Sequence, residues 1–142
     1  MRFWDSSALV PLFLVESTSD WARSITNSDS EVVVWALTRV ELMSAIERRK
    51  RQAPDMTARL SAAGSEVMRM WNVWNEIRDV ETVRENAERL VATYPLRAAD
   101  ALQLGAALVA ADRSPATLPF VTLDQRLAVA AGREGFPVVG PD

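Results

Sequence analysis

Short apolar segments with strand character alternate with helical segments along this chain, and this alternation limits its possible folds more than any other feature. The clearest strand is Glu31–Ala36, because its Val32-Val33-Val34-Trp35 run is typical of a strand buried in a parallel sheet. Further short strands are expected at 2–5, 119–122 and 137–139. Strands joined by helices predict an α/β fold, a three-layer α/β/α domain around a central, mainly parallel sheet.

Helical segments connect these strands. Helices are expected to begin at Ser6 and Thr38 and to cover 18–28, 55–78, 80–94, 98–111 and 124–134. The segments 55–78 and 80–94 are amphipathic, and we expect them to form the two arms of a helical hairpin. Trp71 and Trp74, at helical spacing, are expected in the core or on a dimer surface. Because there is no repeat and no long linker, residues 1–142 are predicted to form one domain.

The chain contains no cysteine and no histidine, and Lys50 is its only lysine. Thiol nucleophiles, disulfides, thiolate zinc sites and Ser-His-Asp triads are therefore excluded. Lys50 lies in a basic run without a glycine-rich loop, which excludes a phosphate-binding loop lysine as well. If the protein is an enzyme, carboxylates must carry its chemistry, and this indicates a hard metal ion with oxygen ligands.

The sequence also bears on the cellular compartment. Asp5 precedes the apolar stretch near the N-terminus and Glu16 closes it, and no small-residue cleavage site follows, so it does not resemble a signal peptide. No other apolar run approaches the roughly 20 residues of a membrane helix. We therefore expect a cytoplasmic protein that makes no contact with a membrane.

Three aspartates fall at or near the carboxyl edge of the predicted sheet, where open α/β folds bind their ligands. Asp5 ends the first strand, Asp124 follows the strand at 119–122, and Asp100 stands at the head of the apolar helix 98–111. Each of them could by itself be a helix N-cap. As a set they predict an acidic site.

Asp100 is the only acid in its apolar segment, and a buried carboxylate costs several kcal/mol unless it is paired or bound to a cation. Arg97 or a metal ion could meet that need. Glu41, among apolar neighbours on the helix that begins at Thr38, is the fourth candidate; the alternative is a Thr38-x-x-Glu41 capping box. Four acids brought together repel one another, so divalent cations are expected among them, with Mg²⁺ or Mn²⁺ fitting best. Two such ions, about 4 Å apart, could activate a water molecule and stabilise the leaving oxygen of a phosphodiester.

Four motifs, in the right order, match a known family. They are Asp5-Ser6-Ser7-Ala8-Leu9, Thr38-Arg39-Val40-Glu41, Leu96-Arg97-Ala98-Ala99-Asp100-Ala101-Leu102-Gln103 and Phe120-Val121-Thr122-Leu123-Asp124. Through them the whole chain resembles PIN-domain ribonucleases, and it is most similar to the small VapC-type toxins of bacterial type II toxin–antitoxin systems. The resemblance implies a PIN-like fold and a Mg²⁺-dependent endoribonuclease, with Mn²⁺ as substitute, that leaves a 5′-phosphate and a 3′-hydroxyl.

The resemblance also implies a role for particular residues. The catalytic, metal-binding acids would be Asp5, Glu41, Asp100 and Asp124. The supporting residues would be Ser6 and Thr122, which supply hydroxyls near Asp5 and Asp124, Arg97, which orients or screens Asp100, and Arg126, which contacts a phosphate.

The partners implied by the resemblance are an RNA substrate, a second copy of the chain in a homodimer, and a separately encoded antitoxin that blocks the site. The hairpin at about 55–94 corresponds to the variable clip that grips the antitoxin. The net charge of −3 is unfavourable for RNA binding, but it becomes +1 when the four proposed ligands are left out. The Arg48–Arg51 run supplies a local positive patch; the alternative is a solvated helix end that complements the helix dipole.

Other protein classes are tested by single residues. A phosphoacceptor receiver domain needs paired acids at the first strand and a lysine near the last, and neither is present. A haloacid-dehalogenase-type phosphatase needs Asp-x-Asp where this chain has Asp5-Ser6-Ser7. The remaining alternative is a non-catalytic PIN-like module that binds RNA or a protein without cutting, and failure to bind Mn²⁺ would support it.

Overall fold

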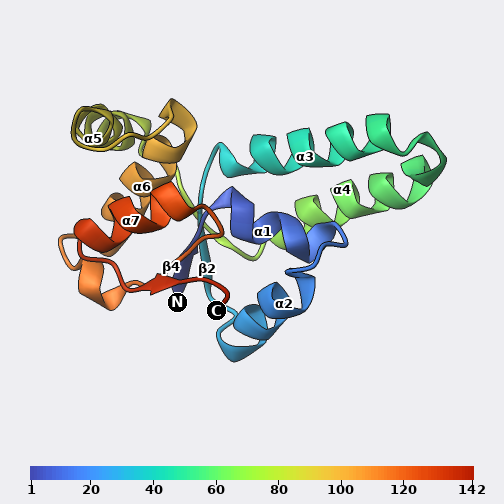
Figure 1. Ribbon diagram of the computed structural model, residues 1–142, viewed down its shortest axis with the longest axis horizontal. Helices are drawn as coiled ribbons and strands as arrows, with labels where there is room; N and C mark the ends of the chain where they lie inside the picture. Colours follow the sequence, from blue (N-terminus) through green and yellow to red (C-terminus); the bar gives the residue numbers. More distant parts are fainter.

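The computed structural model describes residues 1–142 as five parallel strands covered by helices on both faces (Figure 1). In spatial order the sheet is β3-β2-β1-β4-β5, and each pair of neighbouring strands is parallel. The strands are β1 (Arg2–Trp4), β2 (Val32–Trp35), β3 (Asn75–Ile77), β4 (Phe120–Val121) and β5 (Val138–Val139). The predicted α/β class and the three layers are confirmed.

Seven α-helices connect the strands. They are α1 (Ser6–Phe13), α2 (Ser19–Ser28), α3 (Thr38–Gln52), α4 (Thr57–Trp71), α5 (Val80–Thr93), α6 (Ala98–Ala111) and α7 (Gln125–Arg133). Single 3₁₀ turns, η1 and η2, lie at Pro54–Met56 and Pro115–Thr117. The longest helices have 15 residues, and no helix combines the length and the apolar character that a membrane span requires.

The central strands β1 and β2 are buried on both faces, because their side chains alternate between two separate cores. Phe3 and Val33 point into the core formed with α5, α6 and α7, and the ring of Phe3 stacks on Phe120 at 5.4 Å between centroids. Trp4 and Val34 point into the core formed with α1, α3 and α4. This double burial explains the uninterrupted β-branched run in β2.

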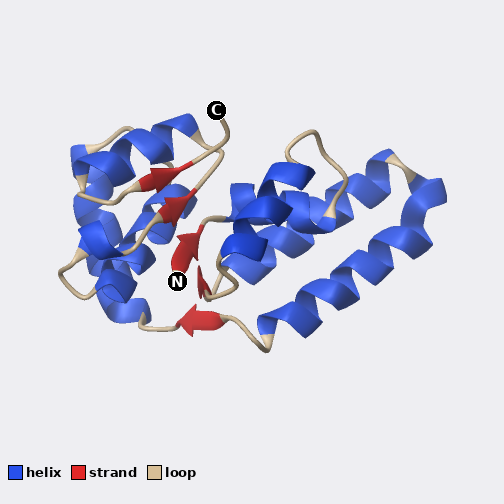
Figure 2. Ribbon diagram, turned by 90° about the horizontal axis from the view of Figure 1, so that it is seen from below, coloured by secondary structure: helices blue, strands red, loops and turns tan.

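The order of the strands creates a crevice at the carboxyl edge of the sheet. The chain begins with β1 at the centre, adds β2 and β3 on one side, and then crosses to β4 and β5 on the other. Figure 2 shows the strands between two groups of helices. The connections after β1 and β4 lead to α1 and α7, which cover opposite faces, so the switch point lies between these two strands. Asp5 follows β1 directly and Thr122 follows β4 directly.

The predicted hairpin of 55–78 with 80–94 is wrong. The helix ends at Trp71, and the strand β3 follows it and pairs with β2. Helix α4 instead runs beside α3, and the two protrude together from the body of the molecule (Figure 1). Helix α5 lies on the opposite face of the sheet from α4, where it packs on α6. The helical periodicity was visible in the sequence. The strand β3 between the two helices, however, places α4 and α5 on opposite faces of the sheet, so they do not pack on each other.

The two tryptophans of this region belong to the core. Trp71 and Trp74 are 6% and 8% exposed and pack against each other, with Phe13 at the edge of Trp74. Trp74 lies beyond the end of α4 and not on it. Of the two locations expected from the sequence, the core is therefore the one found.

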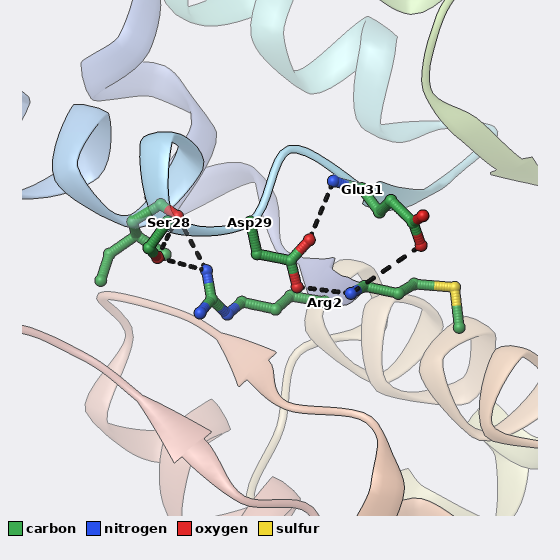
Figure 3. Close-up of polar contacts among 6 residues, drawn as sticks. Arg2, Ser28, Asp29 and Glu31 are labelled. Atoms are coloured by element: carbon green, nitrogen blue, oxygen red, sulfur yellow. Dashed lines mark hydrogen bonds and ion pairs between the residues drawn. The ribbon is translucent and has the colours of Figure 1, made fainter.

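The start of β1 is fastened to the end of α2 (Figure 3). Arg2 Nη1 donates hydrogen bonds to the carbonyl oxygen of Ile25 (2.7 Å) and to Ser28 Oγ (2.9 Å) at the C-terminus of α2. The Met1 ammonium pairs with Asp29, and this hydrogen bond lowers the pKa of the Asp29 carboxyl. These contacts hold the first strand beside the second.

Candidate active site

Asp5 lies where β1 ends, and it is only 3% exposed. Its Oδ1 accepts a hydrogen bond from the backbone N–H of Ser7 (2.7 Å), which makes Asp5 the N-cap of α1. Its Oδ2 accepts hydrogen bonds from the hydroxyl of Ser7 (2.8 Å) and from the hydroxyl of Thr122. The capping alternative is thus correct for Asp5, and the same contacts fix the orientation of its carboxylate.

Thr122 joins the turn after β4 to the turn after β1. Its hydroxyl donates to Asp5 and accepts a hydrogen bond from the backbone N–H of Asp124 (3.0 Å). Next to it, Ser7 Oγ accepts from the backbone N–H of Leu123 (2.9 Å). Asp124 in turn caps α7, because its Oδ1 accepts from the N–H of Leu127 (3.0 Å). The two turns at the switch point are therefore locked to each other.

Glu41 lies in the first turn of α3, and both of its carboxylate oxygens are bound by other elements. Its Oε2 accepts from Ser6 Oγ (2.7 Å), and its Oε1 accepts from Gln103 Nε2 (2.9 Å). Gln103 also hydrogen-bonds Thr38, and both of these side chains are buried. The alternative considered for Glu41, a Thr38-x-x-Glu41 capping box, is wrong, because Leu37 precedes the helix as its N-cap and no side chain caps it.

Asp100 and Asp124 face a common cleft of about 570 Å³ at the carboxyl edge of the sheet. Asp100 lies within the first turn of α6 and is not its N-cap, so the capping alternative is wrong for this residue. The cleft is lined by Glu41, Pro95, Arg97, Ala99, Asp100, Asp124, Gln125 and Arg126. Asp5 is not on its surface but is connected to it through Ser6, whose hydroxyl lies between Asp5 and Glu41.

The pKa values show that the acids act on one another. Burial raises the pKa of Asp5 to about 6, and the negative charge of Glu41 adds to the rise. Burial also raises the pKa of Glu41, with a contribution from Asp100. The pKa of Asp100 is raised by burial and by Asp124, and it is lowered in part by Arg97. The four acids therefore form one electrostatically connected series.

The donor set of this site fits a hydrated hard cation. None of the four carboxylates forms an ion pair, since the ion pairs of the protein all lie elsewhere. No three of them come close enough to enclose an ion by themselves. Mg²⁺ is commonly held by one or two carboxylates and keeps several water molecules, so the arrangement suits Mg²⁺ or Mn²⁺.

Sequence reasoning did not assign a role to Gln103 or to Ser7. Gln103 is the only uncharged polar residue in the apolar helix α6, and it lies three residues after Asp100, on the same side of that helix. That isolated polar side chain was a usable signal. Ser7 follows Ser6 directly, but only the structure shows that it bridges Asp5 and Leu123.

Fold and site together define an α/β/α protein with an acidic cleft at the switch point of a parallel sheet. The model of the PIN domain family matches residues 2–133. The chain belongs to the PIN domain family, whose members are generally nucleases. Among solved structures, a toxin–antitoxin complex from Klebsiella pneumoniae is similar in fold, with a TM-score of 0.65 and 20% sequence identity, over 100% of this chain and 98% of that chain. Among curated proteins no sequence match was found.

Proposed function

We propose that this PIN-domain protein is a divalent-cation-dependent endoribonuclease, and that it is the VapC-type toxin of a toxin–antitoxin pair. The observation that carries the proposal is the series Asp5, Glu41, Asp100 and Asp124, which lies at one sheet edge without any ion pair. Because the chain has no histidine and no cysteine, carboxylates are the groups available for hydrolysis. Membership of a nuclease family supports this assignment.

We propose that the four acids hold Mg²⁺, or Mn²⁺ in its place, one or two of them directly and the others through the water molecules that the ion keeps. When bound, the cation polarises the phosphodiester and lowers the pKa of an attacking water. The protein's own part is to hold the ligands in place: Ser7 and Thr122 fix Asp5, while Ser6 and Gln103 fix Glu41. Carboxylates oriented in advance need no rearrangement as the reaction proceeds.

Two arginines on the cleft have a proposed role toward the substrate. Arg97 and Arg126 line the same cavity as Asp100 and Asp124. A phosphodiester that approaches four carboxylates is repelled unless cationic groups compensate. We assign Arg126 to a substrate phosphate, and Arg97 to the partial neutralisation of Asp100, whose pKa it lowers.

The proposed partners are an antitoxin, a second copy of the chain and an RNA substrate in the cytoplasm. The similarity to a toxin–antitoxin complex supports the first of these. Of the segment 55–94, only α4 lies on the protruding α3–α4 hairpin, so we assign the antitoxin contact to that part and not to α5.

Mapping of RNA ends tests the proposal. The purified protein is incubated with total bacterial RNA in Mg²⁺ or Mn²⁺, and new 5′-phosphate ends are sequenced. The control variants are Asp100→Asn and a matched Asp112→Asn, which removes the same charge at the opposite end of α6. Asp112 has a φ of 43°, a conformation that asparagine also adopts readily. We expect discrete ends from the wild type and from Asp112→Asn, and none from Asp100→Asn or in EDTA.

The alternatives give different results. New ends that persist in EDTA, or in Asp100→Asn, would contradict a cation-dependent site at this cleft. Absence of new ends together with absence of Mn²⁺ binding, measured by calorimetry, would favour the non-catalytic PIN-like module. Mn²⁺ binding without new ends would support the metal site and contradict the proposal that the protein cleaves cellular RNA.

A further inference from the structure

A second groove, of about 400 Å³, adjoins the acidic cleft. It lies between α1 and α3, and Glu41 lines both cavities, so the two meet at this side chain. Ser6 contributes to the groove from α1, while Glu41, Ser44 and Arg48 contribute to it from α3. These last three residues are spaced by three and four positions and therefore share one face of the helix. The groove leads from the proposed catalytic acids to the guanidinium of Arg48.

Arg48 is available to bind an anion, unlike the next two residues of the basic run, Arg49 and Lys50. Arg49 forms an ion pair with Glu16 (3.0 Å), and Lys50 forms one with Glu47 (2.9 Å). Arg48 is exposed and forms neither an ion pair nor a hydrogen bond within the protein. The basic run is therefore not one uniform positive patch: Arg49 and Lys50 are paired with acids, while the unpaired Arg48 lines the groove.

Ser44, between Glu41 and Arg48, is also without a partner. The helix serines Ser24, Ser28 and Ser65 donate hydrogen bonds to carbonyl oxygens one turn before them. The hydroxyl of Ser44 makes no hydrogen bond, although it is exposed and lines the groove. The Ser44 hydroxyl is thus free to donate or accept a hydrogen bond from a ligand in the groove, between Glu41 and Arg48.

We propose that the α1–α3 groove binds the RNA strand on one side of the cleaved bond, and that Arg48 contacts a backbone phosphate there. This inference rests on the proposed ribonuclease function. Arg48 lies seven positions after Glu41 in α3, about 10 Å along the helix axis, so the contact lies outside the reacting group. Arg97 and Arg126 line the acidic cleft itself, so a strand that occupies both the cleft and the groove meets guanidinium groups in each.

The dimensions of the groove favour an unpaired strand. Neighbouring helices such as α1 and α3 pack at about 8–10 Å between axes, which leaves no room between them for a duplex. Proteins that follow a single strand use positively charged grooves with polar contacts to the backbone. The substrate region is therefore a loop, a bulge or a single-stranded end.

The test compares Arg48→Gln with Arg51→Gln. Arg51 belongs to the same basic run and also lacks an ion pair, but it does not line the groove. Binding of a fluorescein-labelled single-stranded RNA of mixed sequence is measured by anisotropy between about 50 and 200 mM salt, with Ca²⁺ in place of Mg²⁺. Cleavage of the same RNA in Mg²⁺ gives KM and kcat.

We expect Arg48→Gln to raise Kd and KM about three- to tenfold and to leave kcat unchanged. The slope of log K against log salt should become shallower by about 0.7, the value for one phosphate contact with a single strand. Arg48→Lys should keep the wild-type slope because it keeps the charge, and Arg51→Gln should behave as the wild type. A residue that only stabilises the helix would not change this slope.

The outcomes separate the groove from the reaction. Equal Kd and equal slopes for Arg48→Gln and Arg51→Gln would contradict RNA binding in the α1–α3 groove, even if the wild type cleaves RNA. A wild type that binds RNA without cleaving it, with a reduced slope in Arg48→Gln alone, upholds the groove and overturns the ribonuclease. A wild type that binds no RNA at the lowest salt overturns both.

Discussion

The amide of Gln103 on α6 donates a hydrogen bond to Oε1 of Glu41 on α3 over 2.9 Å, although 62 residues separate the two in sequence. The same Nε2 donates to Thr38 Oγ1 (2.8 Å). Gln103 and Thr38 are 1% and 0% exposed, so neither group can exchange its partner for water. One buried amide therefore orients the proposed ligand Glu41 and hydrogen-bonds the buried hydroxyl of Thr38 at the start of α3.

Replacement of Gln103 by methionine should lower both stability and activity. The variant keeps the volume but leaves the buried Thr38 hydroxyl without a partner, which should cost about 1–3 kcal/mol of unfolding free energy. Glu41 also loses one of its two hydrogen bonds, and RNA cleavage should fall more than tenfold. Urea denaturation and cleavage rates measure the two effects.

The double variant Thr38→Val with Gln103→Met separates these effects. With both partners apolar, part of the lost stability should return, because no buried polar group is left over. Cleavage should stay low, since Glu41 is still not oriented from α6. Recovery of cleavage together with stability would mean that Gln103 has only a structural role.

Asp5 should make the protein less stable as the pH rises through weakly acidic values. Its pKa is about 6 in the folded protein and 3.8 in the reference state, so between these values the folded state binds more protons than the unfolded one. Protonated Asp5 contributes its full share to the unfolding free energy below pH 3.8. This share decreases as the pH rises toward and past 6, and the total loss is about 3 kcal/mol.

Comparison with Asp5→Asn isolates this contribution. The variant has no charge to bury, so its stability relative to the wild type should increase as the pH is raised from 4 to 7 in EDTA. Urea midpoints across this range measure the difference. A constant difference would show that folding does not shift the pKa of Asp5, and a decreasing difference would show that folding lowers it; either would contradict the prediction. Mn²⁺ should reduce the difference at pH 7, because a bound cation stabilises the carboxylate.

Asp100→Asn should keep the fold and lose the response to metal. In EDTA at pH 7 its Tm should equal or exceed that of the wild type, because burial and the charge of Asp124 already disfavour the ionised carboxyl. Mn²⁺ should raise the Tm of the wild type and of the control Asp112→Asn through binding to the native state. An equal rise in Asp100→Asn would remove Asp100 from the ligand set.

Gly105→Ala should destabilise the packing of α5 on α6. A Cβ at Gly105 would lie 2.8 Å from the carbonyl oxygen of Val83, so the helices must move apart, at a cost of about 1–3 kcal/mol. The control is Gly64→Ala in α4, where the nearest atom is Met43 Sδ at 3.9 Å. That change should stabilise the protein by about 0.5–1 kcal/mol through helix propensity. Chemical denaturation of both variants measures the contrast, and destabilisation by both would contradict it.

The strands that consist of apolar residues were predictable from the sequence, including the short edge strand β5. β2 is uniformly apolar because two cores cover it, and that pattern is local. The edge strand β3 consists of Asn75, Glu76 and Ile77 and carries no such pattern; its pairing with β2 supplies the strand geometry. Because β3 was not predicted from the sequence, α4 was wrongly paired with α5 instead of α3.

The sequence by itself determined the alternation of strands and helices, the restriction to carboxylate chemistry, and the identity of the acids that follow β1 and β4. These are local properties of composition, periodicity and position at strand ends. The tertiary structure alone decided that Gln103 reaches Glu41, that α4 pairs with α3, and that Arg48 is free while Arg49 and Lys50 are paired. Each of these depends on how elements distant in sequence, or side chains on different sides of one helix, are arranged in space, and residue order alone does not specify that arrangement.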